Sequence, residues 1–414
     1  MLTLDLIHTV AFAGVMLFVG YGIRRQVPIL ARYNIPAPVI GGLLVTVATL
    51  FARQAGVTLF QFDTTLQAPL MTAFFTSVGF GASTTLLRAG GPQVLVFFAL
   101  ASAIAVVQNL VGVALTIPFD LHPLFGVLSG SVTMAGGPAT GLAFAPEFAR
   151  AGVPGAASVA IAAAMAGIIA GGLLGGPMGT RLIERYRLAP VRTGAGPGTH
   201  HAEVPSAAEL VEARVPEPTP EHTADESAAA YTLLKSVVAI LVAMWIGSWV
   251  SAGVRALGLT VPAYIGAMLV AVVVRFVDDR TGLIGLSQRT IDDLGAAALS
   301  LFLVLALMTL KLWELAALAL PLIIVVAVQT ALVAALCVWP VFRVMGRDYD
   351  AAVMGSGFCG FMLGTTANAM ANMTALVERY GPAPRAFLVV PMVGAFFIDF
   401  TNAIIITIFL NVLR

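Results

Sequence analysis

Charged residues are scarce in this chain of 414 residues, because Asp, Glu, Lys and Arg together make up only 10% of it. Soluble domains carry about 25% charged residues to cover a surface that faces water. Hydrophobic residues account for 59% of this sequence, so most of its surface must face lipid. The composition excludes a soluble globule and predicts a polytopic membrane protein.

The net charge is also small and cysteines are few, and each observation excludes further classes of protein. The formal net charge is +1 with no basic cluster, which argues against nucleic-acid binding. The chain has two cysteines, Cys337 and Cys359, without CxxC spacing, and we interpret both as packed thiols. It also lacks an HExxH motif and any metal-ligand cluster in its sequence. We therefore expect neither an enzyme nor a cofactor.

Long apolar runs alternate with short polar segments in both halves of the chain. A helix needs about 20 apolar residues to cross the hydrocarbon core of a bilayer. Arg24 and Arg25 follow the first run rather than precede it, which is typical of a first spanning helix and not of a cleaved signal peptide. Spans are expected near residues 6–23, 37–52, 68–87, 93–117 and 156–180, and near 231–253, 262–276, 295–313, 318–340 and 386–412.

Two glycine-rich segments repeat at equivalent places in the two halves. They read SGSVTMAGGPATG from Ser129 and SGFCGFMLGTTANAM from Ser356, and this alignment brings Gly137 onto Gly364. Both segments are too polar for an ordinary span, and paired broken segments mark the binding site of secondary transporters. Close helix packing through small residues is the alternative interpretation. We predict re-entrant hairpins at about residues 124–148 and 353–377.

Other matches extend the similarity between the halves. Pro38-Val-Ile-Gly-Gly matches Pro262-Ala-Tyr-Ile-Gly with one residue of slack, and Gln108 falls opposite Gln329. Each half has an odd number of crossings, so the halves must be inverted in the membrane. The expected fold is an all-α polytopic membrane protein with two inverted-topology repeats, residues 1–185 and 231–414, each with five transmembrane helices and one re-entrant hairpin.

The distribution of basic residues predicts the orientation. With the N-terminus outside, 17 of the 22 Lys and Arg residues fall on the inner side and 5 on the outer side. The positive-inside rule then predicts periplasmic termini and a cytoplasmic middle segment. That segment, residues 186–230, is rich in Pro, Gly, Glu, His and Thr, which favours a flexible linker. Its histidines, His200, His201 and His222, are better explained by a solvated linker than by a metal site.

The hairpin tips offer groups for an anion and for a cation. Limbs of ~12 residues reach ~18 Å, which is past the middle of the membrane. The second limb begins with free N–H groups at the positive end of a helix dipole, which favours an anion. The first limb ends with unpaired carbonyl oxygens that suit sodium. The expected substrate-binding residues are Gly136, Gly137, Thr140, Gly364, Thr365, Thr366, Asn368 and Asn372.

Asp399 is the only carboxylate expected well inside the hydrocarbon. An ionised side chain there is costly unless it is paired, so an intramembrane acid is a functional candidate. Asn402 lies three residues on and shares its helix face. Together the two side chains are expected to bind sodium or carry a proton, with a structural hydrogen bond as the alternative. The expected sodium ligands are Asp399, Asn402, Ser131, Thr133, Ala135 and Leu363.

Three amides lie in the middle of predicted spans, and each either joins helices or lines the cavity. An arginine near a helix end is a further candidate to line it. These residues are Gln108, Asn109, Gln329 and Arg385.

The same residues carry a resemblance to a known family. LFLVLALMTLKLWELA from Leu301, YDAAVMGSGFCGFMLG from Tyr349, AFLVVPMVGAFFIDFTNA from Ala386, IPAPVIGGLLV from Ile35 and QNLVG from Gln108 resemble the glutamate:sodium symporter family of bacterial inner-membrane carriers. The resemblance covers both halves and omits only the linker. It implies sodium-driven uptake of L-glutamate across the inner membrane. It also implies a homodimer with an elevator-type mechanism, in which one domain slides against a fixed one.

The chain departs from the family pattern at both tips. The family's first tip reads SGGHGTG, and Pro138 and Ala139 replace its His and a Gly. The second tip has a Pro-Thr pair in the family, where this chain has Ala367 and Asn368. Another dicarboxylate or amino acid, coupled to sodium or protons, is therefore an alternative to glutamate, and a passive anion channel is a further one. No arginine is expected near mid-membrane to hold a side-chain carboxylate.

Overall fold

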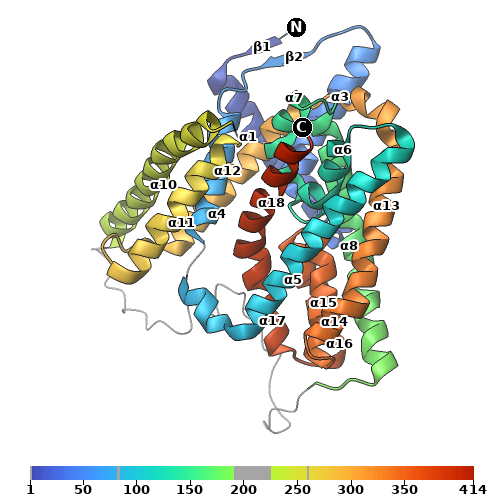
Figure 1. The fold of residues 1–414 in the computed structure, drawn as a ribbon. Helices are drawn as coiled ribbons and strands as arrows, with labels where there is room; N and C mark the ends of the chain where they lie inside the picture. The colour runs from blue at the N-terminus through green and yellow to red at the C-terminus, as the bar shows by residue number, and fades with distance from the viewer. Residues whose placement is uncertain (1, 82–83, 191–224, 259–260) are drawn as a thin grey trace.

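The computed structural model describes residues 2–81, 84–190, 225–258 and 261–414. The fold is helical, as predicted, apart from one parallel pair of short strands near the N-terminus (Figure 1). These strands, β1 (Leu2–Leu4) and β2 (Phe60–Phe62), pair outside the helical bundles.

The first half contains long helices on either side of a helix–turn–helix. Its helices are α1 (Leu6–Gln26), α2 (Pro28–Arg32), α3 (Ala37–Gln54), α4 (Gln67–Phe80), α5 (Thr84–Thr116), η1 (Ile117–Phe119), α6 (Pro123–Val127), η2 (Leu128–Val132), α7 (Gly137–Arg150) and α8 (Ala156–Tyr186).

The second half has the same arrangement. Its helices are α10 (Asp225–Ala256), α11 (Ala263–Thr281), α12 (Gln288–Met308), η3 (Leu312–Leu318), α13 (Ala319–Leu336), η4 (Cys337–Val341), α14 (Phe342–Val344), α15 (Tyr349–Met362), α16 (Thr366–Tyr380), α17 (Pro384–Met392), η5 (Val393–Phe397) and α18 (Ile398–Val412).

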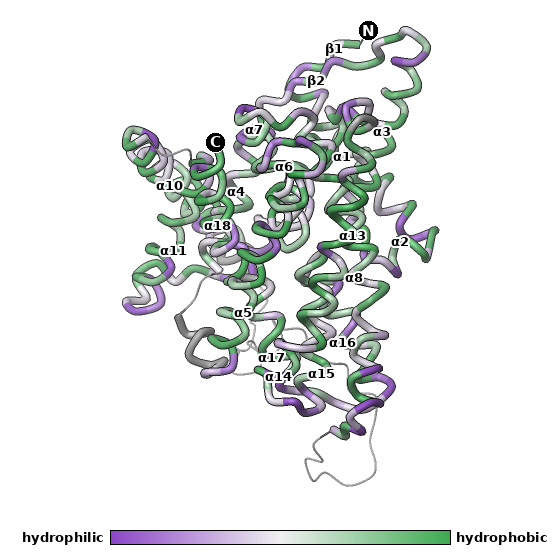
Figure 2. Tube along the Cα trace, turned by 45° about the vertical axis from the view of Figure 1, so that its right-hand side comes forward, coloured by the Kyte–Doolittle hydropathy of each residue, from purple (hydrophilic) through white to green (hydrophobic). Residues whose placement is uncertain are grey.

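Several helices are long and apolar enough to cross a membrane, which makes this a multi-pass membrane protein. Apolar residues fill the middle of the helices, and hydrophilic residues gather toward their ends (Figure 2). Among the described residues, seven helices have the length and apolar composition of a membrane span: 6–26, 37–54, 91–119, 156–186, 230–256, 288–308 and 319–344.

The three other predicted spans differ from ordinary spanning helices. The helix expected at 68–87 is α4, which has 14 residues and ends at Phe80. In α11 the last turns carry charged residues that include Arg275 and Asp278. The final span changes from α17 through the π-helical segment η5 to α18, after a proline at position 391.

Other helix boundaries also differ from the prediction. Helix α12 ends at Met308 rather than at 313, where the chain passes into the 3₁₀ segment η3. Helix α10 begins at Asp225, so the last residues of the predicted linker are helical. Residues 191–224 of the linker lie outside the described residues.

The helices form two bundles, and each half of the chain contributes to both. Helices α1, α3 and α4 pack with α10, α11 and α12, and we call this group the six-helix bundle. Helices α5–α8 pack with α13–α18, and we call this group the hairpin bundle because it holds both helix–turn–helix units. In Figure 1, α4, α10, α11 and α12 lie on the left, and α5, α8, α13 and α18 lie to their right.

Glycine allows close helix crossings at matching places in the six-helix bundle. A Cβ at Gly41 on α3 would collide with the carbonyl oxygen of Met16 on α1. A Cβ at Gly266 on α11 would collide with the carbonyl oxygen of Gly247 on α10. These two glycines are the ones that the internal sequence match places opposite each other. Small residues at such positions let helix backbones approach closely.

We expect Gly41→Ala and Gly266→Ala to destabilise the protein by about 1–3 kcal/mol, because the crossing helices must separate to admit a methyl group. The apparent melting temperature in detergent measures this effect. Gly14→Ala is the matched control, since a Cβ at Gly14 on α1 meets no atom within 4 Å. Equal melting temperatures for Gly41→Ala and Gly14→Ala would contradict the close-crossing explanation.

Candidate functional site

The turns of the two helix–turn–helix units meet. In the first unit, the chain turns at Ala135 and Gly136 and re-enters a helix at Gly137, which has a left-handed φ of 65°. In the second unit, the turn precedes α16 and contains Gly364. A Cβ at Gly137 would lie 3.3 Å from the carbonyl oxygen of Gly364. The alignment of the two halves paired these same two glycines, so equivalent tips lie in contact.

A cavity of about 320 Å³ lies between the tips and the six-helix bundle. Its tip side is mainly backbone, glycine and hydroxyl groups, and its other side comes from α1, α3, α4 and α12. The lining residues are Ala135, Gly136, Gly137, Pro138, Ala139, Phe361, Gly364, Thr365, Thr366, Gly394 and Asp399 in the hairpin bundle, and Tyr21, Arg24, Pro36, Ala37, Pro38, Phe74, Leu299, Ser300 and Leu303 in the six-helix bundle.

Two helices begin at this cavity. Helix α7 begins at Gly137 without a side-chain cap, and α16 begins after Thr365, whose hydroxyl accepts a hydrogen bond from the N–H of Asn368 at 3.3 Å. The Thr366 hydroxyl donates to the carbonyl oxygen of Gly394 at 2.8 Å, which ties the second tip to η5. Both helix N-termini present partial positive charge to the cavity.

The structure brings five predicted substrate residues to the cavity and places three behind it. Asn368 Nδ2 donates to the carbonyl oxygen of Ile168 on α8 at 2.8 Å. Asn372 Nδ2 donates to the carbonyl oxygen of Gly171 on the same helix at 3.0 Å. Thr140 is buried in α7, one turn beyond the tip. These three side chains support the tips, and the five at the cavity are Gly136, Gly137, Gly364, Thr365 and Thr366.

The predicted sodium ligands also divide into two groups. Asn402 Nδ2 donates to the carbonyl oxygen of Ser131 at 2.9 Å, behind the tips. The Thr133 hydroxyl donates at 2.8 Å to a carbonyl oxygen of its own limb. Leu363 is fully buried, and its carbonyl oxygen lies against a glycine of α8. The two that line the cavity are Ala135 and Asp399.

The mid-helix amides connect elements behind the tips. Gln108 Nε2 donates to the carbonyl oxygen of Met362 at 3.2 Å. Gln329 Nε2 donates to the carbonyl oxygen of Gln108 at 2.6 Å. Asn109 Oδ1 accepts from the N–H of Ser131 at 2.9 Å. None of the three amides lines the cavity, so they hold α5, α13 and the two helix–turn–helix units together.

The cavity has two charged lining residues, and they come from different bundles. Asp399 belongs to α18, and Arg24 belongs to the last turns of α1. Neither forms a hydrogen bond or ion pair with another residue that the structure describes. Arg385 lies elsewhere, with its guanidinium 2.5 Å from the carboxylate of Asp348.

Arg24 is a cavity-lining residue that the sequence analysis does not single out. Helix α1 continues to Gln26 rather than ending near residue 23, so Arg24 belongs to the helix and not to the loop after it. Tyr21 lines the same cavity one turn earlier. In the sequence, Arg24 is visible as part of the pair Arg24 and Arg25, which the count of basic residues assigns to the inner loop.

Known proteins resemble this chain over almost its whole length. A family model described as Sodium/glutamate symporter matches residues 2–382. A protein named Sodium/glutamate symporter from Haemophilus influenzae is 37% identical over 407 residues, which cover 98% of this chain and 97% of that protein. Proteins of the same name from Escherichia coli K12 and Shigella flexneri are 37% identical over 411 residues, covering 99% of this chain and 98% of theirs. The chain belongs to the sodium/glutamate symporter family.

Proposed function

We propose that this protein is a secondary-active symporter that imports L-glutamate together with sodium. Family membership supports the reaction, and the cavity at the paired tips supports its location. At about 320 Å³ the cavity lies at the small end of ligand pockets, which span roughly 300–1,000 Å³. That size suits an amino acid. The observation that carries the proposal is the convergence of two helix N-termini, one guanidinium and one carboxylate on this cavity.

The charges of glutamate match the groups around the cavity. The N-termini of α7 and α16 attract a carboxylate, as helix N-termini do for anions. The Arg24 guanidinium offers paired donors for a second carboxylate. Asp399 and the carbonyl oxygens near Ala135 are left for a sodium ion, which offsets the negative charge of the substrate. The bound ion therefore helps to retain the anion.

The departures from the family pattern have different consequences for selectivity. Pro138 and Ala139 line the cavity, so they limit which substrate shapes the cavity accepts. Asn368 does not line it, because its amide points to α8. The changed first tip, rather than the changed second tip, is the place where selectivity among glutamate and related acids is set.

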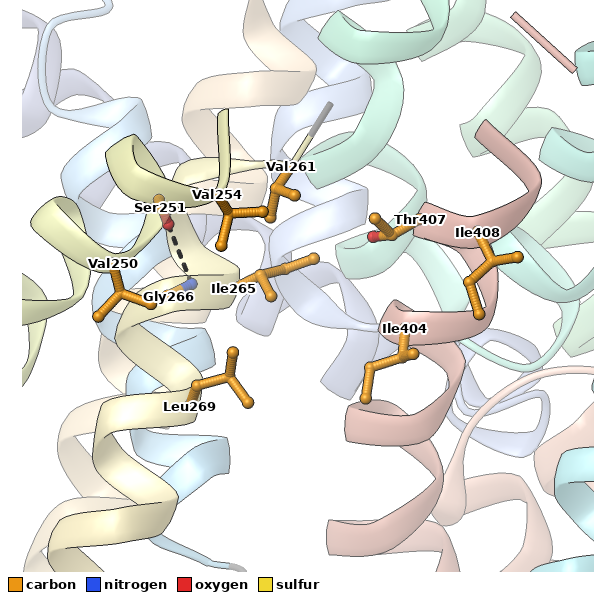
Figure 3. A pocket seen from close by; sticks show the side chains of 10 residues that line it. All are labelled: Val250, Ser251, Val254, Val261, Ile265, Gly266, Leu269, Ile404, Thr407 and Ile408. Carbon is orange, nitrogen blue, oxygen red and sulfur yellow. Dashed lines mark hydrogen bonds between the residues drawn. The ribbon is translucent and has the colours of Figure 1, made fainter. Parts of the chain in front are cut away.

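We propose two inverted repeats and an elevator-type movement of the hairpin bundle against the six-helix bundle. Each repeat supplies three helices to one bundle and one helix–turn–helix to the other. An apolar groove of about 140 Å³ separates α18 from α10 and α11 (Figure 3). Ser251 bonds within its own bundle, to the N–H of Gly266, and the hydroxyl of Thr407 bonds within α18. No hydrogen bond joins these lining residues across the groove, which suits sliding.

We place the protein in the bacterial inner membrane with periplasmic termini and a cytoplasmic linker, following the excess of Lys and Arg on the inner side. In this orientation Arg24 lies at the cytoplasmic end of α1, so the cavity faces the cytoplasmic half of the membrane. We also propose a homodimer through the six-helix bundle. Helix α10 carries Trp245 and Trp249 exposed on its surface, at 60% and 61% exposure.

The reconstituted protein should take up labelled L-glutamate when an inward sodium gradient is imposed, and not with potassium in its place. Asp399→Asn should reduce this uptake at least tenfold and raise the sodium concentration for half-maximal rate, because the cavity loses its carboxylate. Unchanged sodium dependence in Asp399→Asn would remove Asp399 from the sodium site. Wild-type uptake without any sodium dependence would overturn the symport proposal itself.

Arg24→Gln should weaken equilibrium binding of L-glutamate by roughly 10-fold to 150-fold, since a hydrogen bond to a charged group contributes about 1.5–3 kcal/mol. Binding of glutamine should change less, because it lacks the side-chain carboxylate. Arg25→Gln is the matched control, as Arg25 is exposed and does not line the cavity. Equal losses in both variants, or equal losses for both ligands, would exclude Arg24 as a carboxylate contact.

Cysteines at Ile265 and Ile404, on opposite sides of the apolar groove, should block uptake when a short bifunctional thiol reagent joins them. Cysteines at Val250 and Leu269, both in the six-helix bundle, should leave uptake unchanged when joined in the same way. A gel shift verifies each cross-link, and the single-cysteine variants show the effect of the reagent alone. Full uptake by the cross-linked Ile265 and Ile404 pair would mean that the bundles do not move against each other.

A further inference from the structure

The first limb of the first helix–turn–helix breaks behind the cavity. Gly130 has backbone angles of φ −97° and ψ −129°, which are not helical, inside the π-helical segment η2. Non-helical backbone at membrane depth is tolerated only where protein groups or a wet cavity satisfy it. Short π-helical segments are also frequent at functional sites. The break therefore calls for partners from neighbouring helices.

Two side-chain amides from other helices form hydrogen bonds with the backbone N–H and the backbone carbonyl oxygen of the next residue, Ser131. Asn109 Oδ1 on α5 accepts from the Ser131 N–H, and Asn402 Nδ2 on α18 donates to the Ser131 carbonyl oxygen, both at 2.9 Å. Asn109 is 0% exposed and Asn402 is 1% exposed. Three elements thus meet around one residue that is itself fully buried.

Polar atoms remain without partners on Ser131, on the two amides that bond to it, and on Ser129, two residues before it in the chain. Ser131 Oγ, Ser129 Oγ, Asn402 Oδ1 and Asn109 Nδ2 are buried and form no hydrogen bond with any described residue. Leaving one such atom unsatisfied costs about 1–3 kcal/mol. Native proteins rarely leave several together, so the group points to a bound species. Oxygen atoms predominate in it, and Asn109 Nδ2 is the one dedicated donor.

We propose that this group is a second sodium site, with Ser131 Oγ, Ser129 Oγ and Asn402 Oδ1 as ligands and Asn109 positioning Ser131. Neutral oxygens suit a hard monovalent cation, and the broken helices of secondary transporters bind sodium with groups of this kind. Divalent cations prefer carboxylate ligands. Among the described residues, no three or more His, Cys, Asp or Glu side chains gather as a metal site here or elsewhere.

The second site is distinct from the position of Asp399. Asp399 lies three residues before Asn402 on α18 and lines the cavity, whereas Asn402 is turned to Ser131 behind the tip. The inference rests on the proposed sodium coupling and assigns one ion to each position. Sodium bound at Ser131 joins α5, η2 and α18. This ion therefore orders the first tip before glutamate binds.

Thermal unfolding of the purified full-length protein in detergent, without glutamate, tests the site by titration with NaCl against KCl. Ser131→Ala should raise the sodium concentration for half-maximal stabilisation roughly tenfold, equivalent to about 1.4 kcal/mol. This variant keeps both backbone bonds of residue 131 to the amides. Ser131→Cys should give the same loss with nearly unchanged shape, because sulfur is a poor ligand for a hard cation.

Ser356→Ala is the matched control. Ser356 is the buried serine that aligns with Ser129 in the second half, and its hydroxyl donates to the carbonyl oxygen of Gly175 at 2.9 Å. The Ser356→Ala variant should reach half-maximal stabilisation at the same sodium concentration as the wild type. The double variant Ser131→Ala, Asp399→Asn should lose the sodium-dependent stabilisation that the single variant Asp399→Asn retains. Wild-type titration in both Ser131 variants would assign the unpaired atoms to bound water and overturn the site, whether or not the protein transports glutamate.

Discussion

Two turns of irregular backbone meet at Gly137 and Gly364, and their peptide groups leave regular helical pairing in a region that the sequence places within the membrane. Lipid offers no hydrogen bonds, so the protein itself must satisfy these groups. Buried amides from neighbouring helices do so at Ser131, in the limb before the first turn, where Asn109 and Asn402 bond to its N–H and carbonyl oxygen. Two asparagines of α16 join the second unit to α8 by donating to carbonyl oxygens of that helix.

This requirement explains why the candidate site has two layers. The inner layer consists of amides that support the tips and lie out of reach of the cavity. The outer layer consists of the tips themselves, where side chains are small and the N-termini of α7 and α16 face the cavity. One charged residue is added from each bundle, Asp399 from the hairpin bundle and Arg24 from the six-helix bundle. The proposed movement of one bundle against the other would therefore change which charges surround the substrate.

Much of this site was predictable from the sequence because its parts are local or repeated. The alignment of the two halves paired Gly137 with Gly364, and the expected intramembrane position of Asp399 marked it as a functional candidate, which the structure places at the cavity. The partners of Asn368 and the contribution of Arg24 were not predictable in this way. Asn368 was expected to meet substrate because it follows the tip, yet its side chain points to α8, and such a direction depends on tertiary packing. Arg24 was missed because the end of α1 was judged from hydropathy alone.

We propose that equivalent tips from the two halves form one substrate site facing the six-helix bundle. An electron cryomicroscopy structure of the protein with L-glutamate and sodium would test this proposal. We expect ligand density between Gly137 and Gly364, with one carboxylate at the helix N-termini and the other toward Arg24. Ligand density elsewhere, or a glutamate bound at only one tip and away from Arg24, would contradict it.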